Sequence, residues 1–304
     1  MITFFSTPKP FRGHIGIIQR NAMRSWTLAH PGAEVILFGN EEGAAEAARE
    51  LGARHESEVE RNSLGTPLLS SLFERADRLA RHNRLCFLNA DILLTDDFLA
   101  ASARLLQIHE RSLMVGRRCD MDITEPWDFS SPDWGQRLRS LAGKRGKLRP
   151  AQWIDYFVFP RGLLHQQVPP FAVGRPGYDN WLLWKVRSMG VPVVDATQTV
   201  MAIHQNHDYS HHPGGQEGLW RDVEAKQNYA LLGKGHFATI ENATHRLTPR
   251  GLRPNYYHWV AQAKRKTLAF GSAAWFALLG LTRPVRHKLG LRQGVVPKVQ
   301  SEKK

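Results

Sequence analysis

The sequence predicts an α/β fold in which a Rossmann-like, doubly wound, mostly parallel sheet is followed by a basic helical tail. In the first hundred residues, short apolar runs alternate with helical patterns, an order that places parallel strands between covering helices. Charge also divides the chain: residues 243–304 hold 13 basic residues against one acidic residue, a charge of +12, whereas residues 1–242 hold 28 against 27, a charge of +1. We therefore expect one main domain over 1–242 and a basic, partly amphipathic extension over 243–304.

The regular elements of the first half follow one another along the chain. Apolar runs typical of buried strands occupy residues 2–5, 35–38, 85–88 and 113–116. Apolar periods typical of helices occupy residues 15–26, 41–51, 68–81 and 96–108. Thr95 stands at the N-cap of the last of these helices, and the acidic residue Asp96 follows it in the first turn, where the helix dipole favours negative charge.

The second half is less regular. Between residues 117 and 149 the chain is charged and rich in turn residues, which predicts a loop. Later segments predict a strand at 153–160, a helix at 180–189 with Asp179 at its N-cap, a strand at 191–195 and an extended segment at 199–204.

Cysteine content and the N-terminal segment bear on the cellular compartment. Only Cys86 and Cys119 occur among 304 residues, which excludes a disulfide framework. The N-terminal segment has no basic start and only a short apolar run, unlike a signal peptide. No apolar stretch reaches the roughly 20 residues that a membrane-spanning helix needs. We expect a cytoplasmic protein that does not span a bilayer.

The first candidate for chemistry is the segment Asn89-Ala90-Asp91, directly after the buried strand at 85–88. Open α/β sheets bind ligands outside the carboxyl ends of their strands. A carboxylate there is well placed to hold a hard divalent cation against a diphosphate. The alternative is that Asp91 only caps the segment that follows, because Asp is common after strands.

A second candidate is His204, which is followed by three more histidines, His207, His211 and His212. One hypothesis is that these four residues form an all-histidine zinc site, because imidazole is a common metal ligand. Structural zinc usually recruits cysteine, however, and no cysteine is near in sequence. A surface loop without a metal is the plainer alternative for the three later histidines. We favour His204 paired with Asp91 across the sheet as a metal site.

The third candidate is Asp179, which follows a Gly-Arg-Pro-Gly loop at the start of a helix. A carboxylate that removes a proton from an acceptor hydroxyl benefits from rigid placement at the end of an element. An N-cap that only satisfies free backbone amides explains an Asp at this position equally well. Both readings remain open.

Several segments together resemble the GT-A glycosyltransferases. They are residues 4–8 (FFSTP), 21–26 (NAMRSW), 89–91 (NAD), 155–160 (DYFVFP), 174–181 (GRPGYDNW) and His204. The resemblance extends over about residues 1–212, which makes a GT-A type sheet and a GT-A-like glycosyltransferase domain the expectation for residues 1–242.

The resemblance implies roles for individual residues. The donor, a nucleotide sugar, is expected to contact Thr7, Asn40, Asn89 and Asp91. The family's DxD motif holds Mn²⁺ or Mg²⁺ on the diphosphate, and here Asn89 replaces the first Asp, so the metal ligands implied are Asp91 and His204. Asp179 matches the base of inverting members. The residues expected to contact the acceptor are Asp155 and Trp181.

Other side chains have two readings each. Arg118 and Arg175 are either phosphate contacts or solvated arginines. Trp153 and Trp181 either stack on the apolar face of a sugar ring or belong to the core. The sequence has no motif that decides between these readings.

The predicted function is a metal-dependent glycosyltransferase that transfers a sugar from a nucleotide-sugar donor to a hydroxyl of a glycan or lipid-linked acceptor, with inversion. One alternative is a sugar-phosphate nucleotidyltransferase, but residues 6–13 lack the glycine density of its phosphate loop. Another alternative is a nucleic-acid-binding protein that acts through its basic tail. The near-neutral charge of residues 1–242 argues against it, and we expect no nucleic-acid partner.

The tail has the composition of an interfacial helix. Residues 255–281 are aromatic and aliphatic, and basic clusters at 264–266 and 283–288 flank their apolar part. Such segments lie on anionic lipid surfaces. A helix that packs on the domain with a solvated basic face is the alternative. We expect peripheral attachment to the inner face of the membrane.

Overall fold

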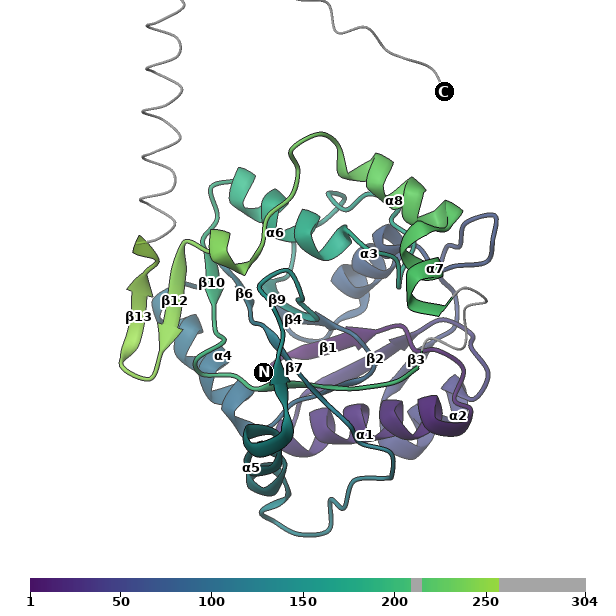
Figure 1. The fold of residues 1–304 in the computed structure, drawn as a ribbon, viewed down its shortest axis with the longest axis vertical. Helices are drawn as coiled ribbons and strands as arrows, with labels where there is room; N and C mark the ends of the chain where they lie inside the picture. The colour runs from purple at the N-terminus through teal and green to yellow at the C-terminus, as the bar shows by residue number, and fades with distance from the viewer. Residues whose placement is uncertain (209–214, 257–304) are drawn as a thin grey trace, which may run out of the picture. The chain divides into compact units, whose positions relative to one another are not determined.

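The computed structural model describes residues 1–208 and 215–256, and two sheets organise this part of the chain (Figure 1). The larger sheet has nine strands in the order β13-β12-β10-β6-β9-β4-β1-β2-β3. Strands β9 and β13 run antiparallel to their neighbours, and all other pairs are parallel. The predicted α/β fold with a mostly parallel sheet is therefore confirmed. The strands are β1 (Thr3–Ser6), β2 (Glu34–Phe38), β3 (Arg54–Glu56), β4 (Arg84–Leu88), β6 (Leu113–Val115), β9 (Tyr156–Pro160), β10 (Val193–Asp195), β12 (His245–Thr248) and β13 (Gly251–Pro254).

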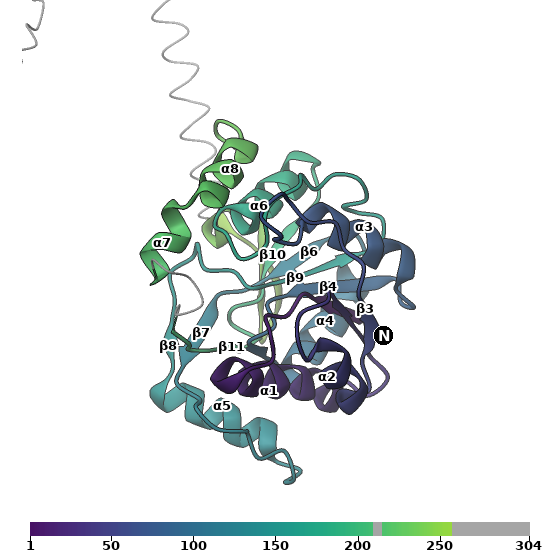
Figure 2. The same cartoon turned by 90° about the vertical axis from the view of Figure 1, so that its right-hand side faces the viewer.

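Helices cover both faces of this sheet, as Figure 2 shows. On one face lie α1 (Gly13–Ala29), α2 (Ala44–Leu51) and α4 (Asp96–Ile108). On the other lie α3 (Leu69–Leu79), α6 (Tyr178–Ser188) and α8 (Val223–Leu232). Adjacent residues of the central strand β1 therefore belong to opposite cores: Phe4 packs under α1 and α4, whereas Phe5 packs under α3. Burial on both faces explains the continuous apolar runs of the strands.

A second, smaller sheet has the order β5-β11-β7-β8. Its strands are β5 (Ile92–Leu93), β11 (Ala202–Gln205), β7 (Arg118–Met121) and β8 (Lys147–Leu148), and α5 (Trp134–Arg145) packs against it. The prediction of a loop between residues 117 and 149 is therefore wrong. Cys119 and Met121 alternate along β7 and pack against Leu138 of α5. The short strands β7 and β8 and the helix α5 therefore form in a segment whose sequence is dominated by charged and turn residues.

Further elements lie outside the predicted pattern. Helix α7 (Gly215–Arg221) precedes α8, and the short 3-10 helix η1 (Ile240–Asn242) leads into β12 and β13. Strand β12 pairs in parallel with β10, so the sheet includes residues that the sequence assigns to the extension. Residues 257–304 lie outside the described residues. They include both basic clusters and all of the segment 255–281 except its first two residues. No helix within the described ranges is both long and apolar enough to cross a bilayer.

Candidate active site

A cavity of about 560 Å³ opens at the carboxyl ends of β1 and β4. Most of the residues singled out from the sequence line it: Thr7, Asn89, Asp91, Asp155, Asp179 and His204. Two do not. Asn40 is exposed outside the cavity wall, and Trp181 is only 5% exposed because it packs in the core against Phe171 and Trp184. Trp181 is thus a core residue, and the expectation that it contacts an acceptor is wrong.

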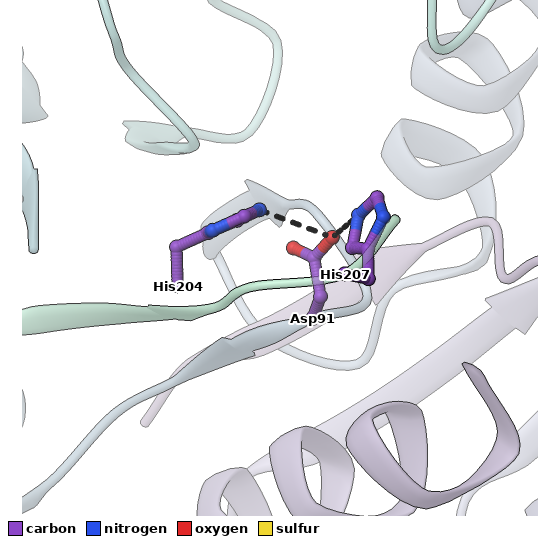
Figure 3. A group of neighbouring side chains, drawn as sticks. All are labelled: Asp91, His204 and His207. Atoms are coloured by element: carbon purple, nitrogen blue, oxygen red, sulfur yellow. Dashed lines mark ion pairs between the residues drawn. The ribbon is translucent and has the colours of Figure 1, made fainter. Parts of the chain in front are cut away.

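Three side chains in this cavity form a cluster with metal-ligand spacing. One ligand atom each from Asp91, His204 and His207 lies within 4.8 Å of the others. Nε2 of His204 is 3.6 Å, and Nε2 of His207 is 3.3 Å, from Oδ2 of Asp91. Figure 3 shows both rings directed at the same carboxylate. The third member, His207, is one of the histidines for which a plain surface loop was the alternative.

The fold brings these residues together through strand register. After β4 leaves the large sheet, the chain passes Asp91 and enters β5 of the small sheet. There Ile92 pairs with His204 in antiparallel register, so His204 lies one residue from Asp91 across the ladder. The backbone N–H of Gln205 donates to the carbonyl of Asp91 at 3.3 Å. Backbone pairing therefore fixes the positions of these two residues relative to one another.

The electrostatics of the cluster suit a divalent cation. Burial alone raises the pKa of Asp91, but the neighbouring His204 and His207 outweigh it and lower this pKa below its usual value. Burial lowers the pKa of His204, and the carboxylates of Asp91 and Asp120 raise it above its ordinary value. Oδ1 of Asp91 is buried without a hydrogen-bond partner in the described structure. One carboxylate and two imidazoles form a donor set that fits Mn²⁺ and other divalent transition metals.

A carboxylate that the sequence did not single out lies behind His204. Asp120 is paired with His204 in the register of β7 and β11, and its Oδ1 is 3.4 Å from Nδ1 of His204. Metal-binding histidines commonly hold their second nitrogen against a carboxylate in this way. No sequence motif marks Asp120; only the period-2 alternation with Cys119 places it on the cavity face of β7.

Asn89 belongs to a buried polar network. Its Nδ2 donates to Oδ1 of Asp155 at 2.7 Å, and the hydroxyl of Tyr178 donates to its Oδ1 at 3.3 Å. The second oxygen of Asp155 accepts from Arg118 at 3.0 Å. Because both carboxylate oxygens of Asp155 are bound within the protein, this residue orients Asn89 and Arg118, and the structure does not leave it as the open acceptor contact expected from the sequence.

Asp179 lines the cavity from the first turn of α6. The N-cap of this helix is Gly177, in a left-handed conformation with φ of 107°, so the expectation that Asp179 is the N-cap is wrong. A Cβ at Gly177 would lie 2.9 Å from Leu232, which explains why the chain turns here on a glycine. Burial is the main cause that raises the pKa of Asp179 to about 7; the Asn180 backbone N–H opposes it, and the charge of Asp155 adds to it. A carboxyl group with this pKa can accept a proton near neutral pH.

Aromatic side chains form the wall beside Asp179. Trp153, Trp220, Tyr229 and Phe237 all line the cavity. The rings of Trp153 and Trp220 lie 5.7 Å apart. The guanidinium groups of Arg118 and Arg149 each lie 4.6 Å from the centre of the Trp153 ring. Trp220, Tyr229 and Phe237 keep about half of their surface exposed, 45%, 48% and 53% respectively, so their ring faces remain available to a ligand.

Comparison with known proteins gives structural likeness only. No protein-family model and no curated protein matches the chain. Glucosyl-3-phosphoglycerate synthase from M. tuberculosis matches with 16% identity and a TM-score of 0.45 over 76% of this chain and 79% of that chain, and it has been solved with Mg²⁺ and uridine diphosphate. A mycobacterial protein matches with 17% identity and a TM-score of 0.46 over 76% and 74%. TarS from S. aureus matches with 12% identity and a TM-score of 0.39 over 68% and 58%.

Proposed function

We propose that this protein is a metal-dependent glycosyltransferase that transfers a sugar from a nucleotide-sugar donor to a hydroxyl acceptor. One observation carries the proposal: the cluster of Asp91, His204 and His207 shares a cavity at the carboxyl end of β4 with Asp179. A metal site and a carboxyl group of near-neutral pKa in one pocket meet the two needs of the reaction, stabilisation of a leaving diphosphate and removal of a proton.

The donor binds at the end of β1 and β4 in this proposal. Thr7 lines this part of the cavity, and Asn89 is held in place by Asp155 and Tyr178. A divalent ion held by Asp91, His204 and His207 supplies Lewis-acid stabilisation of the charge that builds on the leaving diphosphate. The three protein ligands fix the position of that charge relative to Asp179.

Asp179 is the base that accepts the proton of the acceptor hydroxyl. Its carboxylate lines the cavity on a rigid helix start, and its pKa near 7 leaves a large ionised fraction at neutral pH. Attack by an acceptor hydroxyl activated in this way displaces the diphosphate from the opposite side of the sugar carbon, so we propose inversion at that carbon.

The acceptor is a glycan or a lipid-linked sugar in this proposal. Trp153 and Trp220 stand where an acceptor sugar could stack its apolar face, and the half-exposed rings of Tyr229 and Phe237 extend the same wall. These residues take the place of Trp181. The basic tail, whose residues 257–304 lie outside the described part of the chain, would keep the enzyme in the cytoplasm at an anionic membrane surface.

One observation favours the sugar-phosphate nucleotidyltransferase alternative: a basic residue, Lys9, follows β1 and lines the cavity. The two activities consume different substrates. A nucleotidyltransferase joins a nucleoside triphosphate to a sugar phosphate and releases pyrophosphate. Pyrophosphate release from such a mixture, with no hydrolysis or transfer from nucleotide sugars, would favour the alternative and reject the glycosyltransferase.

The direct test of the proposal is a thermal-shift screen of UDP- and GDP-sugars with and without Mn²⁺. We expect stabilisation by one nucleotide class that requires the metal and disappears in Asp91→Ala. The control is Asp128→Ala, because Asp128 is exposed and forms its ion pair with Arg137 away from the cavity. Equal stabilisation of Asp91→Ala and the wild type would reject the metal assignment.

The role of Asp179 is tested with Asp179→Asn. This variant should bind the donor as the wild type does and lose transfer, because the amide cannot accept the proton. In the wild type, kcat should rise with pH through about 7 as the base ionises. Turnover that persists in the variant with the same pH profile would remove Asp179 from the mechanism.

A further inference from the structure

Lys9 stands on an unusually rigid stretch of backbone for a lysine. It lies between Pro8 and Pro10 just after β1. Its backbone N–H donates to Oε1 of Gln19 at 2.6 Å, and Nε2 of Gln19 donates back to its carbonyl at 2.9 Å. Gln19 is itself only 2% exposed on α1. The side chain of Lys9 therefore extends into the cavity from a fixed point.

The arginines of the cavity wall are already neutralised by protein carboxylates. Arg118 pairs with Asp120 at 2.8 Å and with Asp155 at 3.0 Å. Arg175 pairs with Asp222 at 2.7 Å and with Glu224 at 2.5 Å. These pairs leave neither guanidinium as the open phosphate contact considered from the sequence.

Lys9 differs from both arginines. No carboxylate of the described chain lies within ion-pair distance of its ammonium. Burial lowers the pKa of Lys9, and the more distant charges of Asp91 and Asp208 counteract this only in part. A partly buried ammonium is stabilised by an anion that accompanies it in the cavity. Lys9 is half-buried in the cavity wall, so its ammonium is available to an anionic ligand next to the Asp91 cluster.

We infer that Lys9 binds the diphosphate of the donor directly and gives the site nucleoside-diphosphate affinity that does not depend on metal. This inference rests on the proposed function, because it places the diphosphate at the Asp91 cluster. The ligand class is a diphosphate ester, whose oxygens accept charge-assisted hydrogen bonds from an ammonium.

The composition of the proposed metal cluster explains why the positive charge of Lys9 would contribute to diphosphate binding. Asn89 stands where the resemblance implies a carboxylate, so Asp91 is the single acidic member of the cluster. A cluster with one carboxylate attracts a divalent ion less strongly than one with two. Lys9 supplies positive charge to the leaving phosphate from the protein itself, on the β1 side of the cavity.

The inference predicts opposite changes in two affinities when Lys9 is replaced. In Lys9→Met, the binding of uridine diphosphate and of inorganic pyrophosphate in EDTA should weaken about 10-fold or more, the usual loss for a charged hydrogen bond. The binding of Mn²⁺ to the nucleotide-free protein should instead strengthen, because a cation near Asp91 has been removed. Calorimetry measures the first affinity, and the electron paramagnetic resonance signal of free Mn²⁺ measures the second.

Two control variants separate this role from a structural one. Lys9→Arg should restore most of the diphosphate affinity in EDTA. Lys226→Met removes an exposed lysine on α8 away from the cavity and should change neither affinity. A variant that merely unfolds would lose both affinities together, and its thermal transition would report the loss.

The outcomes distinguish the inference from the proposed function. If the wild type binds the nucleotide only with Mn²⁺, or if Lys9→Met and the wild type bind pyrophosphate equally in EDTA, the inference is wrong and the glycosyltransferase proposal stands. If neither uridine nor guanosine diphosphate binds with or without metal, the proposed function itself fails.

Discussion

His204 lies between two carboxylates, with Nε2 3.6 Å from Oδ2 of Asp91 and Nδ1 3.4 Å from Oδ1 of Asp120. The residue is only 5% exposed to solvent. Asp91 and Asp120 thus lie on opposite sides of the imidazole, and in the proposed metal site Asp120 would favour the ring orientation in which Nε2 faces the ion.

Asp120→Asn should weaken Mn²⁺ binding about 10-fold or more, because a carboxylate that orients a ligating histidine also increases its basicity. Titration of Mn²⁺ by calorimetry measures the change. The matched control is Asp128→Asn, which makes the same substitution at an exposed aspartate. Unchanged Mn²⁺ affinity in Asp120→Asn would show that His204 is held by the β5–β11–β7 register alone.

Asp179→Asn should stabilise the protein at alkaline pH. The folded state raises the pKa of Asp179 from 3.8 to about 7, so between these values the folded chain retains a proton that the unfolded chain has lost. Stability therefore falls as pH rises through this window, by at most about 4 kcal/mol. The variant has no such cost. Urea unfolding should show a gain over the wild type at pH 8 that vanishes near pH 4.

A gain of equal size at pH 4 and pH 8 would contradict this prediction, because it would show that the amide packs better without any contribution from charge. The same experiment with Asp195→Asn, on strand β10 outside the cavity, controls for the general effect of replacing an acid.

His30 should make the fold sensitive to acid. It is 1% exposed among the rings of Phe4 and Phe98, and neither ring nitrogen has a hydrogen-bond partner in the described structure. Burial lowers the pKa of His30 from 6.5 to about 4, and the distant Asp96 offsets little of this. Between pH 6.5 and pH 4, His30 is therefore protonated in the unfolded chain and neutral in the folded chain. The free energy of unfolding falls as pH falls through this window, by about 3 kcal/mol.

His30→Phe removes that titration and keeps the aromatic contacts, so its unfolding free energy should change less between pH 7 and pH 4.5 than that of the wild type. Urea denaturation at both pH values gives the comparison. Parallel decreases in the two proteins would assign the acid sensitivity to other groups.

Arg175 should be important for stability. Its guanidinium joins the loop before α6 to Asp222 and to Glu224, and the side chain of Glu224 is 4% exposed. Arg175→Met leaves these two acids without their cation, which should cost about 3 kcal/mol of unfolding free energy. Arg221→Met breaks an ion pair whose partners are both more than 70% exposed and should cost close to nothing. Similar losses in the two variants would contradict this assignment.

The first half of the fold could be predicted because its signals are local. Residues 2–5 and 85–88 are almost entirely apolar, as strands between two helix layers are, and Thr95 is the N-cap of α4, as predicted. The small sheet could not be predicted in this way. Its strands β5 and β8 have two residues each, too few to establish a period, and they form only because partners distant in sequence are present.

The candidate site shows the same division. Asp91 and His204 are residues that the resemblance implies as ligands, and strand pairing brings them together. His207 comes two residues after β11, and its position depends on the path of the backbone beyond the strand. The sequence does not distinguish Trp181 from Trp153. In the structure, Trp181 packs against Phe171 in the core, whereas Trp153 lines the cavity.

The passage of the chain from β4 through Asp91 into β5 couples ion binding to the integrity of the fold. Asp91 follows a strand of the large sheet, whereas His204 belongs to the small one. A bound ion would join the segment that follows β4 to strand β11, and part of its binding free energy would oppose the separation of these two segments. Amide hydrogens of β11 should then exchange with solvent more slowly in the loaded protein, so the metal protects the framework that positions it.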